Sequence, residues 1–214
     1  CIFCQNYDIS HQGRGEEVSA GELAGMMLRL QDMGCHNINL VSPTHQVPAI
    51  VEALIEAVPR GLRLPLVYNT GGYDAVPTLE LLEDIVDIYM PDFKYMDSES
   101  AREMSGAEDY PVAAMAALRE MHRQRGDLHI DDAGLAHRGL LVRHLLLPNH
   151  RAATDRVLAF LADLSKNTYV NLMDQYRPEY RARECFDLRR RITLQEYDEA
   201  VATARSLGLY RLDR

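Results

Sequence analysis

The sequence predicts a single α/β domain, residues 1–214, in which the short strands of a parallel sheet alternate with outer helices. Two observations predict this fold class. The candidate strands are short apolar runs with little period-two alternation, which is typical of parallel strands buried on both faces. Each of them except the last is followed fairly directly by a helical pattern. Right-handed crossovers would then build either an open doubly wound sheet or a barrel-like curl.

The helices are predicted from their caps and from apolar residues at helical spacing. Ser19 and Glu22 have the S-x-x-E spacing of a capping box, in which each side chain accepts from the other residue's backbone N–H, and Gly34 stops that helix. Residues 126–138 are expected to form an exposed insertion. In chain order the expected elements are this first helix, strand 38–41, helix 47–58, strand 64–68, helix 79–84, strand 86–90, helix 110–125, strand 139–147, helix 157–164, strand 169–173 and a capped helix from Thr193 to Gly208.

Polar residues remain at the strand ends once the predicted core is set aside. The carboxyl ends of parallel strands meet at one edge of a sheet, so functional side chains are expected there. Arg143 interrupts an apolar strand, and a buried guanidinium needs an anionic partner, either a structural carboxylate or a ligand. Asp92 and Lys94 are either site residues or a strand-end ion pair. The groups are Ser42-Pro43-Thr44, Asn69-Thr70 in a turn that continues to Gly72, Asp92-Phe93-Lys94 and Asp174-Gln175-Tyr176.

Charge and composition exclude several functional classes. The chain has 32 acidic and 23 basic residues, a formal charge of −9, which argues against a nucleic-acid-binding protein. No apolar run approaches the roughly 20 residues of a membrane span, so no membrane partner is expected. The basic run from Arg181 to Arg191 also contains acidic residues and is interpreted as a solvated face or a partner-docking patch. Four cysteines, only two of them close together, favour a reduced, cytoplasmic setting over a disulfide scaffold.

The pair Cys1-Ile2-Phe3-Cys4 has three interpretations. Vicinal thiols on a thioredoxin-like fold would exchange disulfides. A structural zinc would need a second Cys or His pair, which Cys35-His36 and the isolated Cys185 do not provide. An iron–sulfur cluster suits thiolate ligation but needs more than two thiols. The chain opens on Cys1 rather than Met, so its natural start is expected upstream, where further ligands would lie.

The segment Cys1-Ile2-Phe3-Cys4-Gln5-Asn6 resembles the end of the C-x₃-C-x₂-C signature of radical S-adenosylmethionine enzymes, with the typical aromatic residue before the last cysteine. The first cysteine of the signature would sit four residues before Cys1. The closest group is the proteins similar to pyruvate formate-lyase activating enzyme. Within it, an uncharacterised branch has close counterparts of Ile38 to Gln46, Val67 to Gly72 and Tyr89 to Lys94, and the likeness covers nearly the whole chain.

The resemblance implies a partial (βα)6-type barrel whose first strand is missing from this chain. It also implies a 4Fe–4S cluster and S-adenosyl-L-methionine as cofactors. One electron from the cluster would cleave the sulfonium C–S bond, yielding methionine and a 5′-deoxyadenosyl radical that abstracts a hydrogen atom. The protein substrate would be a glycyl-radical enzyme, and a flavodoxin or ferredoxin would donate the electron. Such chemistry requires no protein nucleophile or acid–base pair, because the cofactor carries the difficult step.

The resemblance also implies roles for individual residues. Cys1 and Cys4 match two cluster ligands. Ser42, Pro43 and Thr44 replace a Gly-Gly-Glu stretch that binds the amino group of the cofactor, a departure that removes the charge assistance of a carboxylate. The cofactor contacts implied are Phe3, Ser42, Thr44, Asn69, Thr70, Asp92, Lys94, Arg143 and Tyr176, with Gln175 or Tyr176 closing the far side of the pocket.

An alternative hypothesis needs no redox chemistry. In it the chain is an α/β binding module whose Cys1–Cys4 pair holds structural zinc and whose strand ends bind a nucleotide or a protein. This hypothesis predicts zinc, no iron and no cleavage of S-adenosylmethionine. Thr70-Gly71-Gly72 is too short a signal for a glycine-rich phosphate loop and does not favour it.

Overall fold

The structure, a computed structural model, describes residues 1–213. Helices and strands alternate along the chain as expected, and the predictions of strand 38–41, helix 110–125 and strand 169–173 are confirmed to the residue. The elements are α1 (Tyr7–Ser10), α2 (Ala20–Asp32), β1 (Ile38–Val41), η1 (Pro43–Gln46), α3 (Val47–Ala57), β2 (Leu66–Thr70), α4 (Val76–Leu81), β3 (Ile88–Pro91), α5 (Ser98–Ser105), α6 (Tyr110–Arg125), β4 (His129–Ile130), β5 (Ala136–Leu145), η2 (Pro148–His150), α7 (Thr154–Leu164), β6 (Tyr169–Met173), η3 (Tyr180–Glu184), η4 (Phe186–Leu188), α8 (Leu194–Ser206) and β7 (Leu212–Asp213).

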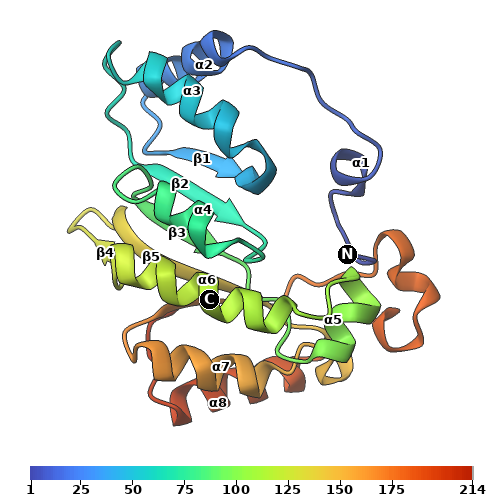
Figure 1. The fold of residues 1–214 in the computed structure, drawn as a ribbon. Helices are drawn as coiled ribbons and strands as arrows, with labels where there is room; N and C mark the ends of the chain where they lie inside the picture. The colour runs from blue at the N-terminus through green and yellow to red at the C-terminus, as the bar shows by residue number, and fades with distance from the viewer. Residues whose placement is uncertain (214) are drawn as a thin grey trace.

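The strands form one sheet in the order β1-β2-β3-β5-β6-β7, and every neighbouring pair along this path is parallel. Strand β4 lies off the path and pairs antiparallel with β5. Helices α2 and α3 pack together beside β1, and α7 packs against α8 beyond β5 and β6 (Figure 1). The prediction of a parallel sheet with outer helices is therefore confirmed.

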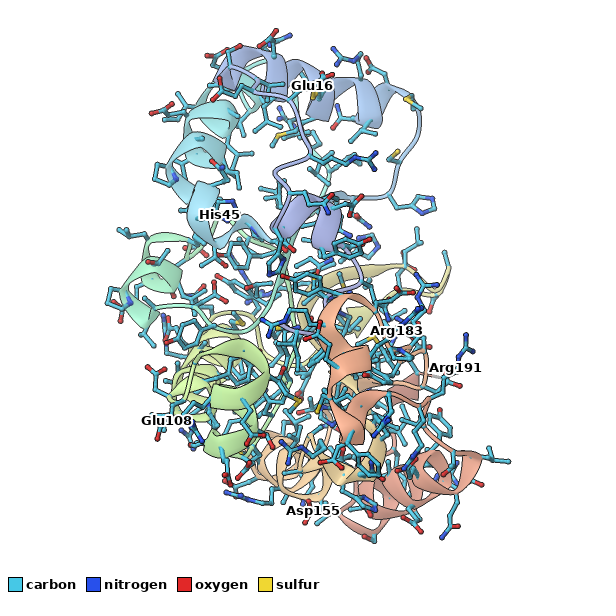
Figure 2. The ribbon with its side chains drawn as sticks, turned by 90° about the vertical axis from the view of Figure 1, so that its right-hand side faces the viewer. Glu16, His45, Glu108, Asp155, Arg183 and Arg191 are labelled. Carbon is cyan, nitrogen blue, oxygen red and sulfur yellow. The ribbon has the colours of Figure 1, made fainter. Side chains whose placement is uncertain are left out.

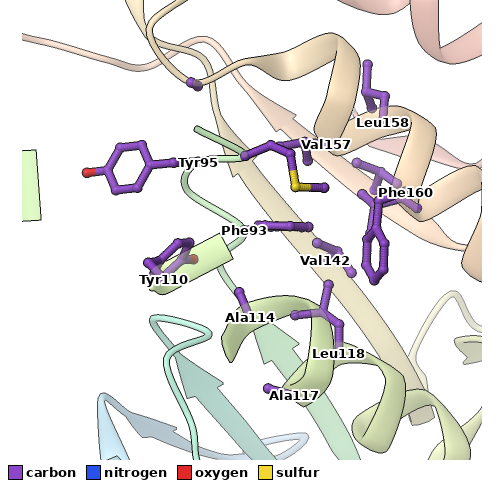
Figure 3. Packing of buried hydrophobic residues seen from close by; sticks show 14 of the residues in the cluster. Phe93, Tyr95, Tyr110, Ala114, Ala117, Leu118, Val142, Val157, Leu158 and Phe160 are labelled. Atoms are coloured by element: carbon purple, nitrogen blue, oxygen red, sulfur yellow. The ribbon is translucent and has the colours of Figure 1, made fainter. Parts of the chain in front are cut away.

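The main core lies where the end of β3 meets α6 and α7 (Figure 3). Phe93 is fully buried and meets Phe160 of α7 edge to face, with ring centroids 5.6 Å apart. Its neighbour Tyr95 packs on Tyr110, the first residue of α6, at 5.5 Å. Burial of large aromatic side chains is the dominant stabilising term in such a core. This packing fixes the chain segment that leaves β3, which carries two of the expected site residues.

Two α-helices and two strands were not expected from the sequence, namely α1, α5, β4 and β7, and neither were the short 3-10 helices η1 to η4. The expected insertion at residues 126–138 is in part a hairpin, because β4 pairs with the start of β5. Asn69 and Thr70 were expected in a turn, but they are the last two residues of β2 and are buried. The reason is that β3 extends the ladder: Thr70 pairs with Pro91, and Asp92 N–H donates to the Thr70 carbonyl oxygen at 2.8 Å.

The N-terminal segment crosses the carboxyl-end side of the sheet and begins beside α5 and the η3–η4 segment (Figure 1). Ile2 anchors it twice: its N–H donates to the Met104 carbonyl oxygen at 2.8 Å, and its own carbonyl oxygen accepts from Arg181 N–H at 2.9 Å. The cysteine pair is thereby held at the edge where the strand ends lie. Among the helices formed by residues 1–213, none is long and apolar enough to cross a bilayer.

Candidate functional site

Three neighbouring strands bring Asn69, Asp92 and Arg143 into direct contact. Arg143 Nε donates to Asp92 Oδ1 at 2.8 Å, and its Nη2 donates to Asn69 Oδ1 at 2.8 Å. Lys94 Nζ donates to Asp92 Oδ2 at 2.5 Å. The anionic partner that Arg143 requires is thus a carboxylate of the protein, and the strand-end ion pair of Asp92 and Lys94 exists. Two cations share one anion, so the cluster carries a net positive charge.

The charge state of Asp92 follows from its neighbours. Burial by itself would raise the Asp92 pKa, but the adjacent Lys94 ammonium and Arg143 guanidinium hold the pKa below its ordinary value. Opposite charges at hydrogen-bond distance favour the ionised carboxylate. The cluster therefore keeps one positive charge in excess at neutral pH, which suits a carboxylate or phosphate group of a ligand.

The backbone around Asp92 is held from two sides. The Tyr110 hydroxyl accepts from Lys94 N–H at 2.9 Å and lies 2.8 Å from the Asp92 carbonyl oxygen, and burial raises the pKa of this hydroxyl. A Cβ at Gly72 would lie 2.4 Å from the same carbonyl oxygen, and Gly72 has a φ of 77°. Only glycine fits such an approach at a positive φ. Sequence reasoning missed both residues, although the Gly71-Gly72 pair at a strand end was a signal.

His144 supports the Asp92–Lys94 segment through a hydrogen bond to its backbone. It is fully buried, its Nδ1 lies 2.6 Å from the Phe93 carbonyl oxygen, and its Nε2 lies 2.9 Å from Thr154 Oγ1. Burial lowers the pKa of His144 to about 4, so the ring is neutral at pH 7. A carbonyl oxygen only accepts, so Nδ1 carries the proton and Nε2 accepts from Thr154. The contacts of His144 make it a support for the Asp92–Lys94 segment.

A pocket of about 200 Å³ opens over the charged cluster. Its walls combine the three charged side chains, uncharged polar groups from the N-terminal segment and the loop after β6, and an apolar surface. Four of the expected contacts therefore lie in one cavity: Phe3, Asp92, Lys94 and Arg143. The complete lining is Phe3, Gln5, Asn6, Asp92, Lys94, Arg143, Leu145, Leu147, Met173 and Gln175.

Tyr176 supports the pocket without lining it. Its hydroxyl donates to the Leu188 carbonyl oxygen at 2.6 Å, and burial raises its pKa to about 12. Its ring meets Phe3 edge to face at 6.0 Å, so it holds that wall residue in place. Of the two residues expected to close the far side, Gln175 is the one in the lining.

Thr44 and Thr70 form a second polar group, centred on Asp74. This carboxylate is 3% exposed and accepts from Thr44 Oγ1 at 2.8 Å, from Thr70 Oγ1 at 2.6 Å and from the Tyr68 hydroxyl at 3.0 Å. It ties the loop after β1 to the end of β2. Ser42 is exposed, with a φ of 54°, and its N–H donates to the Asn69 carbonyl oxygen. Asp74 was not expected, because it lies four residues beyond its strand.

Cys1 and Cys4 share one tight turn, closed by a hydrogen bond from Cys4 N–H to the Cys1 carbonyl oxygen at 3.2 Å. Cys1 Sγ lies 2.9 Å from Ser105 Oγ, and Cys4 Sγ lies 3.2 Å from Ser10 Oγ. Thiolates suit iron–sulfur or zinc chemistry in kind. Within residues 1–213, however, no three Cys, His, Asp or Glu side chains are grouped to hold a metal. The donor set fits such a centre in type, and further ligands are needed to complete it.

Comparison with known proteins gives one informative relative. The chain is 30% identical over 219 residues to the uncharacterized protein MJ0674 of Methanocaldococcus jannaschii. The match covers 98% of this chain and 60% of the archaeal protein, so the chain spans about 60% of the length of that relative. No family model matches the chain.

Proposed function

We propose that the protein is a radical S-adenosylmethionine enzyme similar to pyruvate formate-lyase activating enzyme, built on a partial (βα)6-type barrel. One observation carries the proposal. Phe3 lies between the two cysteines of the Cys1–Cys4 turn, and it lines the same pocket as Asp92, Lys94 and Arg143. The turn that carries the thiol pair therefore contributes a wall residue to a cavity that has both an excess positive charge and an apolar wall, at the carboxyl ends of parallel strands.

The 4Fe–4S cluster would supply one electron for cleavage of the sulfonium C–S bond, and Cys1 and Cys4 would be two of its ligands. The chain's own residues bind and orient the cofactor. Arg143 and Lys94 offer their excess positive charge to its carboxylate. Leu145, Leu147 and Met173 supply an apolar wall that keeps water from the reacting bond.

The uncharged polar residues of the pocket suit the nucleoside part of the cofactor. Gln5, Asn6 and Gln175 carry amide groups that both donate and accept hydrogen bonds, as ribose hydroxyls and adenine nitrogens require. The Phe3 ring, fixed by Tyr95 and Tyr176, provides an apolar face beside them. The proposed hydrogen donor, a glycyl-radical enzyme or another polypeptide, rests on the sequence resemblance alone.

The proposal is tested by anaerobic reconstitution with iron and sulfide of the protein translated from its full reading frame. A cysteine four residues upstream of Cys1 is required. We expect visible absorption that bleaches with dithionite, and 5′-deoxyadenosine formed from S-adenosylmethionine only after reduction. Cys1→Ala and Cys4→Ala should abolish iron binding. The matched controls Cys35→Ala and Cys185→Ala should keep it, because these thiols lie outside the turn. Zinc in place of iron, with no cofactor cleavage, would instead establish the binding-module hypothesis.

A further inference from the structure

The positive charge of the chain is concentrated in the segment of residues 177–191. Six arginines and three acidic residues give this segment a net charge of +3, whereas the whole chain has −9, so the remainder carries −12. All six arginines are exposed. Such separation of charge creates a local potential that attracts negatively charged partners and repels basic ones. The arginines are Arg177, Arg181, Arg183, Arg189, Arg190 and Arg191.

Half of these arginines are not neutralised by the protein itself. Each of the other three has a carboxylate partner: Glu179, Glu184 and Glu196 pair with Arg177, Arg181 and Arg190, respectively. In the part of the chain that the structure describes, none of the ion pairs involves Arg183, Arg189 or Arg191. Figure 2 shows Arg183 and Arg191 on the same face of the molecule. These charges remain available to a partner.

An aromatic anchor lies among the unpaired arginines. Phe186 is 76% exposed, and the Arg189 guanidinium lies over its ring, 4.3 Å from the centroid. Protein interfaces are enriched in arginine and aromatic residues at their energetic centres, surrounded by a polar rim. The segment therefore has the composition of a docking surface for a protein that presents carboxylates around an apolar centre.

The segment is also in direct contact with the cysteine turn. Arg181 N–H donates to the Ile2 carbonyl oxygen at 2.9 Å, between the two cysteines in sequence. The Tyr180 ring stacks on Tyr7 at 5.4 Å, just beyond Cys4. Figure 1 shows the chain start beside this segment. A protein bound to residues 177–191 would therefore lie against the thiol pair.

We propose that residues 177–191 form the docking surface for an acidic, one-electron-carrying protein that reduces the centre held by Cys1 and Cys4. This inference rests on the proposed function, which consumes one electron for each cofactor cleaved. The donor is oxidised by one electron and the centre is reduced by one, with no bond formed between the two proteins. Charge complementarity selects an acidic carrier over a basic one.

The test compares two double variants. One carries Arg183→Gln and Arg191→Gln, and the control carries Arg29→Gln and Arg60→Gln. The control arginines are also exposed and their replacement changes the net charge by the same amount, but they lie on α2 and just after α3. The probes are flavodoxin and a 2Fe–2S ferredoxin, with basic cytochrome c as the charge control. Affinity is measured by titration calorimetry at several salt concentrations, and cleavage is driven separately by dithionite and by each reduced carrier.

We expect the Arg183 and Arg191 variant to bind an acidic carrier about ten-fold more weakly at low salt, with a shallower salt dependence. The control variant should bind the acidic carrier like the wild type, and neither double variant should bind basic cytochrome c more weakly than the wild type does. Dithionite-driven cleavage should be unchanged. Equal weakening by both variants, or no weakening, overturns the docking surface. Failure of dithionite to drive cleavage in the wild type overturns the proposed function instead, whereas the binding measurements still decide whether the surface exists.

Discussion

Replacing Asp92 by Asn should destabilise the fold by about 2–3 kcal/mol at pH 7, a magnitude that follows from the charged cluster. The carboxylate accepts charge-assisted hydrogen bonds from Lys94 at 2.5 Å and from Arg143 at 2.8 Å. Each such bond contributes about 1.5–3 kcal/mol. The side chains of Asp92, Lys94 and Arg143 are 19%, 23% and 27% exposed, so solvent screening reduces the combined contribution of the two bonds. Asn keeps one acceptor oxygen but leaves the two cations facing each other without an anion.

The dependence of this loss on pH is the sharper part of the prediction. Burial opposes ionisation of Asp92, but Lys94 and Arg143 outweigh it and hold the pKa below its ordinary value. A depressed folded-state pKa means that the carboxylate stabilises the fold fully above the unfolded-state pKa of about 3.9, and that this stabilisation is lost as the pH falls through the folded-state value. The difference between wild type and variant should therefore be constant from pH 7 to about pH 5 and shrink below about pH 4.

Urea unfolding followed by circular dichroism at several pH values measures both the loss of stability at pH 7 and its dependence on pH. Asp109→Asn is the matched control, because Asp109 accepts from the Tyr73 hydroxyl at 2.7 Å at the surface and faces no cation in the described chain. Its substitution should change the free energy of unfolding by no more than about 0.5 kcal/mol. A loss below that level for Asp92→Asn, or a loss that persists unchanged at pH 3, would refute the assignment of Asp92 as an ionised partner of two cations.

Three further substitutions test the supports of the site. Gly72→Ala should lower the free energy of unfolding by about 2 kcal/mol or more, because a Cβ there meets the Asp92 carbonyl oxygen at 2.4 Å. Gly34→Ala is the control in the same thermal unfolding assay. Gly34 has a similar φ and nothing within 4 Å of its Cβ position, so this variant measures the smaller backbone penalty alone. Asp74→Asn should lower the free energy of unfolding by about 1–3 kcal/mol, since three hydroxyls lose their charged acceptor, and a wild-type denaturation curve would contradict this. Wild-type stability should fall by up to about 3 kcal/mol between pH 6.5 and 4, because burial lowers the pKa of His144 to about 4 and the unfolded chain gains the proton first. This slope should flatten in His144→Asn, and an unchanged slope would assign it to another group.

The fold was predictable where burial imposes a pattern. Strand β6 alternates buried and half-buried residues, and α6 buries one face that includes Ala114, Leu118 and Met121, so their bounds were predicted correctly. The bounds of β1 were predicted from its apolar composition, although only Ile38 of this strand is buried. The two-residue strands β4 and β7 are too short to show any periodicity. Helix α5 has a polar composition, but Asp97 at its N-cap and Gly106 in the left-handed conformation at its C-cap were signals that sequence reasoning missed. The two short strands form because β5 and β6 pair with them.

The sequence predicted where the site lies better than it predicted which side chains contact one another there. Parallel strands end at one edge, so Asp92, Lys94 and Arg143 were expected together and are together. The partners of each side chain depend on register and loop geometry, which the sequence does not display. Asp74 returns to Thr44 and Thr70 only because of the turn at Gly72, and Tyr176 faces Leu188 rather than the pocket because η4 passes beside it.

Asp92 stabilises the fold but should weaken the binding of an anionic ligand. It neutralises one of the two cations that a ligand carboxylate would contact, so it competes with that ligand for Lys94 and Arg143. Asp92→Asn should therefore weaken the fold yet bind S-adenosylmethionine with equal or higher affinity, because the pocket gains a full positive charge. Calorimetric titration of the reconstituted variant, against the cofactor and against its decarboxylated form, measures this effect. A gain confined to the carboxylate-bearing ligand identifies the pair Lys94 and Arg143 as its anion site. A loss for both ligands shows instead that Asp92 acts by orienting Lys94, which makes the ion pair a structural part of the pocket wall.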